Sequence, residues 1–350
     1  MQLSKNYSIP GILVIVLIAA VFLATGSGAM HISPAQILAI LLHRIHIDIP
    51  VHYDNSMEAV LMIIRLPRVI LGVLTGAGLA TAGAALQGLF RNPMADPGLI
   101  GISSGASAGA VLIIVFQASL PLWLNTGWVH YYAMNIAAFA GAFIAAWLII
   151  RIAGTGSGSM VMLMLLGGIA INALCMAFTW LMAYLSTNEQ MRSIIFWTMG
   201  SLGGATWETV TAVFPFLLLP LILLPRTGAA LDIFSLGEQE ARHIGVNIQR
   251  LKMQLLLLST MVIAASVAVA GVIGFVGLVV PHIVRQFTGP SYKLLFPCAA
   301  LAGAILLTLA DLISRTIVAP AELPVGVVTA ILGAPFFIWL ILKEKRTLMI

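Results

Sequence analysis

Charge is scarce in this chain of 350 residues: only 8% of them are charged, whereas 61% are hydrophobic and the mean hydropathy is +1.07. A water-soluble domain of this size cannot hide so much apolar surface. Only helix bundles and closed barrels span a bilayer, because every backbone polar group must be paired internally. The apolar runs are long and do not alternate with polar residues, so the sequence predicts an all-α transmembrane bundle.

Motifs for nucleotide hydrolysis and metal binding are also missing. The sequence contains no G-x-x-x-x-G-K-[ST] and no Gly-Lys pair, so we expect no enzyme activity and no ATP or Mg²⁺ bound by this chain itself. Cys175 and Cys298 both lie in apolar stretches, which favours packing over a disulfide or a metal site. The outer-segment histidines lack metal-site spacing and are expected in solvated loops: His31, His43, His46, His52 and His130.

Hydropathy predicts one membrane domain over residues 1–350 with about ten spans. The spans are expected near residues 10–30, 67–89, 98–118, 131–151, 160–185, 207–225, 251–271, 274–287, 294–314 and 324–342. The first is interpreted as a retained span rather than a signal peptide, and residues 191–204 as a re-entrant or interfacial helix.

The placement of positive charge predicts the orientation. Twelve of the seventeen Lys and Arg residues fall on one face, and five (Arg44, Arg65, Arg68, Arg192 and Arg315) on the other. The richer face should be cytoplasmic, which also places both termini there. The net charge of +5 then needs no nucleic-acid partner.

Glycines recur at four-residue spacing, as in Gly72 and Gly76 or in the series Gly101, Gly105 and Gly109. Such spacing lets helix backbones approach closely in lipid, so we expect tight bundle packing at these positions.

The segment SLGEQEARHIGVNIQRL, residues 235–251, concentrates charge in this otherwise apolar chain. Ser235 and Glu238 fit a capping box, which predicts a helix beginning near Leu236. Gly245 is expected to end that helix, and Asn247 to cap the next one. The product is either an ordinary amphipathic surface helix or a rigid lever that fits a cleft on a soluble partner.

This segment resembles the coupling loop of the FecCD family, the permease subunits of vitamin B12, haem and iron-siderophore ABC importers. Residues 65–106, 271–285 and 310–341 resemble the same family. The resemblance implies a homodimer of ten-span permeases in the bacterial inner membrane, two cytoplasmic ATPase subunits and an external binding protein. It implies that ATPase coupling involves residues of the 235–250 segment: Ser235, Leu236, Gly237, Glu238, Glu240, Ala241, Arg242 and Gly245.

On the outer face, the resemblance implies that Arg65, Arg68 and Arg315 receive acidic residues of the binding protein. Arginine forks suit carboxylates. Two alternatives stay open: interfacial arginines often extend to lipid headgroups, and Arg315 can pair with Asp311 along a helix. Glu322, just before Pro324, is interpreted as stabilising a helix terminus.

The resemblance also implies that the fifth predicted span lines a channel between two permease copies. Met160, Val161 and Met164 at its start are candidate gate residues, because the two methionines carry flexible thioether side chains; the alternative is packing or lipid contact. Asn172, in the middle of that span, either lines the channel or bonds a neighbouring helix.

The cargo is expected to be haem, an iron-siderophore or a corrinoid. A secondary transporter driven by an ion gradient is the main alternative, but it needs ionisable residues at the membrane midplane. Away from helix ends the predicted spans lack them. A membrane receptor that signals through its inner-face helix is a third alternative.

Overall fold

The structure is a computed structural model that describes residues 8–96, 98, 101–116, 127–154 and 160–348. Within these ranges the chain is built from helices and contains no strand. Among the described residues, eight helices are long and apolar enough to cross a membrane. They correspond to eight of the ten predicted spans and comprise α2 (Ser8–Gly26), α5 (Leu66–Phe90), α7 (Gly127–Ala153), α8 (Met160–Leu185), α10 (Trp207–Arg226), α13 (Ile248–Ala270), α15 (Tyr292–Thr316) and α16 (Val325–Leu348).

The other two predicted spans are present as shorter helices: α6 (Ile102–Phe116), which is apolar, and α14 (Val276–Thr288), which has 13 residues and is more polar. The helix expected at residues 191–204 is α9 (Asn188–Met199), which begins earlier because Thr187 and Gln190 form a capping box. Ser33 and Gln36 form a second box that starts α3 (Pro34–His43). Two pieces, α4 (Asn55–Ala59) and the π-helix η1 (Val60–Arg65), extend α5 at its start.

Helix α5 occupies the centre of the bundle and is buried along most of its length, packed against α10, α13, α14 and α15. Glycine makes this possible. A Cβ on Gly76 would collide with the carbonyl oxygen of Gly303 in α15, and a Cβ on Gly83 with that of Gly277 in α14. In α6, a Cβ on Gly105 would lie 2.6 Å from the Gly141 oxygen. The prediction of close packing at Gly76 and Gly105 is confirmed.

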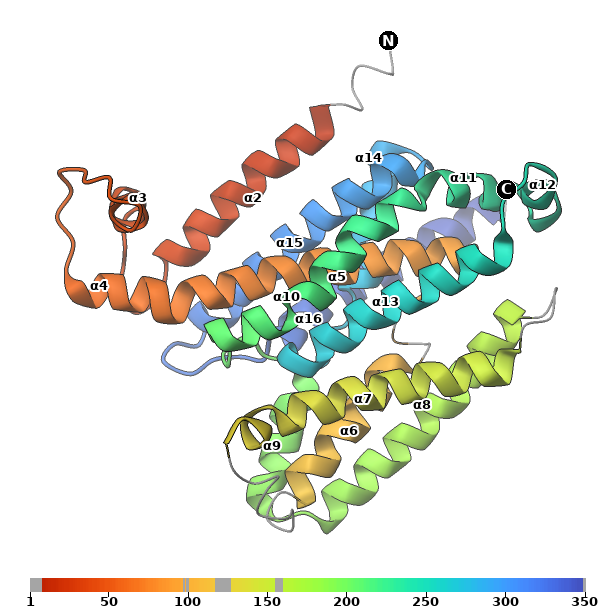
Figure 1. The fold of residues 1–350 in the computed structure, drawn as a ribbon, viewed down its shortest axis with the longest axis horizontal. Helices are drawn as coiled ribbons and strands as arrows, with labels where there is room; N and C mark the ends of the chain where they lie inside the picture. Colours follow the sequence, from red (N-terminus) through yellow and green to blue (C-terminus); the bar gives the residue numbers. More distant parts are fainter. Residues whose placement is uncertain (1–7, 97, 99–100, 117–126, 155–159, 349–350) are drawn as a thin grey trace.

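The two ends of the bundle carry different short helices (Figure 1). Helices α3 and α4 lie at one end, with the start of α5. Two short helices, α11 (Gly228–Leu236) and α12 (Glu238–His243), lie at the opposite end, near the chain's C terminus. Helices α6, α7 and α8 pack on one another along one flank. Polar side chains gather at both ends, so each end offers a candidate site.

Candidate functional site

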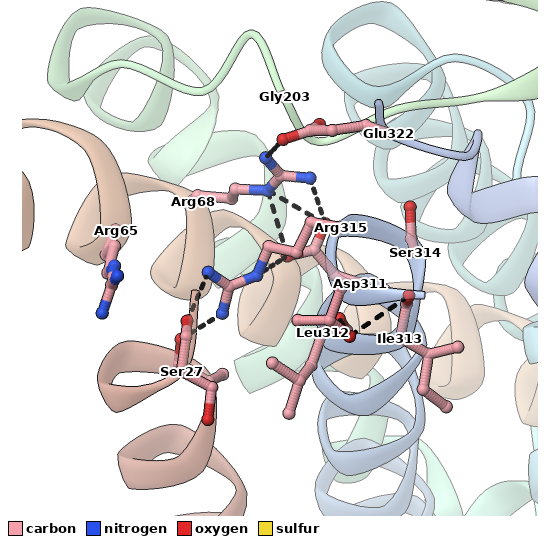
Figure 2. A network of polar contacts seen from close by, with 12 residues as sticks. Ser27, Arg65, Arg68, Gly203, Asp311, Leu312, Ile313, Ser314, Arg315 and Glu322 are labelled. Carbon is pink, nitrogen blue, oxygen red and sulfur yellow. Dashed lines mark hydrogen bonds and ion pairs between the residues drawn. The ribbon is translucent and has the colours of Figure 1, made fainter. Parts of the chain in front are cut away.

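At the α3–α4 end, one buried ion pair joins two central helices. Arg68, in the first turn of α5, donates through Nε and Nη2 to the Asp311 carboxylate of α15 at 2.9 to 3.1 Å. Its Nη1 donates to Glu322 at 2.8 Å (Figure 2). The Arg68 and Asp311 side chains are only 8% and 3% exposed, whereas Glu322 is 44% exposed. The guanidinium therefore ties α5 and α15 to the loop that precedes α16.

Two further arginines bind the end of α2. Arg65 donates to the carbonyl oxygens of Thr25, at 2.6 Å, and Met30. Arg315 donates to those of Ser27, at 3.0 Å, and Ala24. The last carbonyls of a helix lack partners within it and carry partial negative charge, so cations stabilise them. These arginines thereby hold the C-terminal end of α2 against η1 and α15.

We call Arg65, Arg68, Asp311, Arg315 and Glu322 the arginine network. The predicted pairing of Asp311 with Arg315 is present at 3.7 Å, but Arg68 is the closer partner of Asp311. Glu322 was expected to stabilise a helix terminus, and instead its carboxylate binds Arg68. That hydrogen bond and the positive charge of Arg68 hold the pKa of Glu322 below its usual range. The hydrogen bonds of the three arginines to this chain leave little of their guanidinium surface exposed. The structure describes this chain alone, so docking of a binding protein by the arginines stays a prediction.

At the opposite end, the expectation for Ser235 is wrong. Helix α11 was not predicted, and it runs through Ser235 to Leu236 because Leu231 and Phe234 are buried in the core. The Ser235 hydroxyl donates to the Asp232 carbonyl oxygen at 2.6 Å rather than capping a new helix. Gly237, with φ of 152°, separates the two helices, and α12 begins at Glu238.

The end of α12 follows the prediction. Gly245 has φ of 94°, and its N–H donates to the Arg242 carbonyl oxygen at 3.0 Å, while the Val246 N–H donates to that of Ala241 at 2.9 Å. These two bonds form a Schellman motif. The Asn247 side chain then accepts from the Arg250 N–H at 2.9 Å and caps α13.

Residues 236–245, which we call the α11–α12 turn, carry one set of side chains anchored to the bundle and one set that is exposed. Ala241 is fully buried, and Glu238 accepts a hydrogen bond from Lys252 of α13 at 2.6 Å. The exposed set comprises Leu236, Glu240, Arg242 and Ile244, of which Leu236 and Ile244 are 72% and 61% exposed. The sequence pattern did not indicate the Glu238–Lys252 pair, which crosses from α12 to α13. Apolar side chains exposed on a rigid turn are typical of a docking surface.

Of the three candidate gate residues, Met164 is the one whose side chain is described. Met164 is 1% exposed and packs in the core, so its interpretation as a gate residue on a channel wall is not supported; Met162 on the neighbouring face is 65% exposed. The side chains of Met160 and Val161 lie outside the described residues. Asn172 borders a cavity of about 460 Å³ between α6, α8 and α9. Hydroxyls also line this cavity, which we call the polar cavity: Ser103, Ser104, Ser107, Thr179 and Thr198.

Metal-binding groups are not clustered. No group of three or more His, Cys, Asp or Glu side chains that could hold a metal ion occurs among the residues that the structure describes. His43 lies beside Asp48, with 2.6 Å between Nδ1 and Oδ1, and both side chains are exposed. Cys175 and Cys298 are free thiols.

The sequence and the fold of this chain are similar to those of known transport proteins. The model of the FecCD transport family matches residues 15–343. A hemin transport system permease of Yersinia pestis is 46% identical over 84% of this chain and 86% of its own. An Fe(3+)-citrate import system permease of Bacillus subtilis is 39% identical over 96% and 95%. A solved metal-chelate type ABC transporter in an inward-facing conformation aligns with a TM-score of 0.82 and 31% identity, over 96% of this chain and 99% of that one.

Proposed function

The chain belongs to the FecCD transport family, and on that premise we propose that it is the permease of an ATP-driven importer for haem or a related iron chelate. The match over residues 15–343 carries the proposal, together with the eight helices in the described part of the chain that are long and apolar enough to cross a membrane. The permease is not an enzyme, because ATP binding and hydrolysis fall to a separate subunit. A bacterial inner membrane, with both termini in the cytoplasm, fits the charge distribution.

Haem is the first cargo to test, because the hemin transport relative is 46% identical over 84% of this chain. Ferric citrate, an iron-siderophore or a corrinoid are the alternatives. A binding protein outside the membrane would select among them, so the permease needs only to pass a large, amphipathic chelate.

The α11–α12 turn is the proposed contact with the ATPase subunit. Leu236 and Ile244 offer exposed apolar surface, and Glu240 and Arg242 offer charge around it. An apolar centre with a polar rim is the usual anatomy of a protein interface. Gly245 and the Glu238–Lys252 pair fix the turn to α13, so a force on α12 passes into a membrane helix. Two copies of the chain would present two such turns to two ATPase subunits.

An assembly experiment tests this contact. The variant Glu240→Ala with Arg242→Ala should lose about tenfold or more in affinity for the ATPase subunit, measured with purified components. Both side chains are exposed, so its thermal unfolding should match the unmodified permease. Arg151→Ala, an exposed arginine at the end of α7, is the matched control and should assemble normally. Unchanged affinity in the double variant would remove α12 from the coupling site.

The arginine network marks the proposed docking face for the binding protein. Glu322 is partly exposed there, and Arg68 and Arg315 hold the surrounding loop and the end of α2 in place. Arg315→Gln should weaken binding-protein affinity. If thermal stability falls but affinity stays the same, the arginines act only within the permease.

The exposed face of α8 is the proposed wall of the transport pathway between two permease copies. It carries Met162, Leu166, Ile169 and Leu174, all more than half exposed. The polar cavity, with Asn172, opens beside this face and gives an apolar pathway hydrogen-bonding groups for the polar edge of a chelate.

A further inference from the structure

A second cavity lies at the α11–α12 end, on a part of the chain that the transport proposal does not use. It has a volume of about 570 Å³ and lies between α10 and α13, where α10 turns into α11. Arg226 and Arg250 line its rim with Thr227, Asn247 and Gln254. We call this cavity the basic groove. Arg226 is the last residue of α10 and Arg250 the third of α13, so two antiparallel spans bring their arginines together.

The two guanidinium groups in the basic groove have no counter-charge within the described part of the chain. Neither forms a described ion pair, hydrogen bond or ring contact through its side chain, and both residues are exposed. Of the carboxylates on α11 and α12, Glu240 does not line the groove, and the other two are engaged elsewhere. Asp232 accepts from the Tyr292 N–H at 2.7 Å and the Ser291 hydroxyl at 2.9 Å, and Glu238 pairs with Lys252. The groove therefore has an uncompensated positive rim.

The floor of the basic groove is apolar. Leu223 and Leu251 lie close to the rim, and Leu257 and Leu258 lie deeper along α13. Leu257 is seven residues beyond Arg250, which at 1.5 Å per residue places it about 10 Å further into the span. Leu257 is also 49% exposed, and Ile222 on α10 is 46% exposed. The surface thus changes from basic to apolar along the direction in which a lipid leaflet changes from headgroup to acyl chain.

We propose that the basic groove binds an anionic phospholipid. The lipid phosphate sits between Arg226 and Arg250, whose planar forks suit phosphate oxygens, and one acyl chain lies on the leucine floor. Basic pockets between membrane helices on the cytoplasmic side are suited to such headgroups. A free phosphate would use the rim alone and would leave the apolar floor without a partner, so the geometry favours the lipid.

A lipid bound in the basic groove would affect the neighbouring helices, because of where the groove lies. Val246, which belongs to the Schellman motif that ends α12, and Asn247, which caps α13, both line it. An occupied groove would brace α10 and α13 at the base of the α11–α12 turn. Lipid binding itself does not depend on ATP, on a cargo or on a second copy of the chain, so it can be tested in the isolated permease.

The test uses purified, delipidated permease in detergent, titrated with phosphatidylglycerol, phosphatidylcholine or inorganic phosphate. Bound lipid is counted by native mass spectrometry, and the unfolding temperature is measured in parallel, because a ligand that binds only the folded state raises it. We expect phosphatidylglycerol to bind and raise the unfolding temperature more than phosphatidylcholine does, and inorganic phosphate to have no effect.

The decisive variant is Arg226→Gln with Arg250→Gln, which should weaken phosphatidylglycerol binding about tenfold or more. Arg242→Gln removes an exposed arginine at the same end but outside the groove, and should bind the lipid normally. Equal loss in both variants would indicate nonspecific surface charge and overturn the proposal. So would equal responses to the two lipids, a response to phosphate alone, or a double variant that loses ATPase-subunit binding but keeps its lipid.

Discussion

Arg68 and Asp311, separated by 243 positions in the sequence, form an ion pair in which two guanidinium nitrogens contact one carboxylate at 2.9 to 3.1 Å. Both side chains are less than 10% exposed. A buried pair of this kind fixes the relative position of α5 and α15, because either charge alone would be costly to bury.

The first prediction concerns removal of one partner. Arg68→Ala should destabilise the permease by about 3–5 kcal/mol, because it leaves the Asp311 carboxylate buried without its main counter-charge. Arg192→Ala, an exposed arginine on α9, should change stability by less than about 0.5 kcal/mol. Thermal and denaturant unfolding in detergent measure both. If Arg68→Ala with Asp311→Ala costs the sum of the two single changes, Arg68 and Asp311 are not coupled in the folded state.

The second prediction concerns pH. The pKa of Glu322 is lowered in the folded state, chiefly by its hydrogen bond from Arg68. The stability that this bond contributes is therefore complete above the ordinary Glu pKa, and it is lost as the pH falls through the lowered folded-state value. Glu322 is 44% exposed, so the effect should stay near the surface range of about 0.2–1 kcal/mol. Glu322→Gln should be less stable than the unmodified chain at neutral pH and equal to it in acid, where a persistent difference would contradict the account.

The third prediction concerns the glycines of the central helix. Gly76→Ala places a Cβ 2.8 Å from the Cβ of Leu307 and closer still to the Gly303 oxygen, both in α15. Helices α5 and α15 would have to move apart, at a cost of about 1–3 kcal/mol. Gly11→Ala in α2 is the control, because its added methyl meets nothing within 4 Å. Similar unfolding temperatures for the two variants would show that α5 and α15 do not pack through Gly76.

The fourth prediction concerns the polar cavity. Asn172→Leu should slow uptake of the cargo while leaving assembly with the ATPase subunit and the unfolding temperature unchanged, since Asn172 is only partly buried and makes no described side-chain hydrogen bond. Leu219→Ala, an exposed leucine on α10 that lines neither the polar cavity nor the proposed pathway face of α8, is the control for a change of size without a change of polarity. Normal uptake by Asn172→Leu would place the polar cavity off the pathway.

Composition and hydropathy predict the membrane bundle well, because long apolar runs have few alternatives to spanning lipid. All ten predicted spans contain a helix, although α6 and α14 are shorter than full spans. The local signals at Gly245 and Asn247 also act as predicted, since a left-handed glycine and an Asn cap need only their neighbours.

What the sequence pattern does not predict depends on contacts between distant segments. The capping signal at Ser235 is overridden because Leu231 and Phe234 find buried positions that extend α11. Arg65 and Arg315 bind backbone carbonyls at the end of α2. Every residue has a backbone carbonyl, so no residue type in the sequence indicates this contact. Met164 lies one helical turn after Met160 in the sequence and is a candidate gate residue for that reason. In the bundle, however, α8 is oriented so that the Met164 side chain is buried in the core.

The most direct measurement is uptake by the assembled complex in liposomes. The permease, the ATPase subunit and the cognate binding protein are reconstituted, and haem accumulation is followed with ATP and Mg²⁺ supplied on the ATPase side. The account predicts uptake that requires ATP and the binding protein, and that is lost when Glu240 and Arg242 are both replaced by alanine. Uptake by the permease alone, or uptake driven by a proton or sodium gradient without ATP, would contradict it.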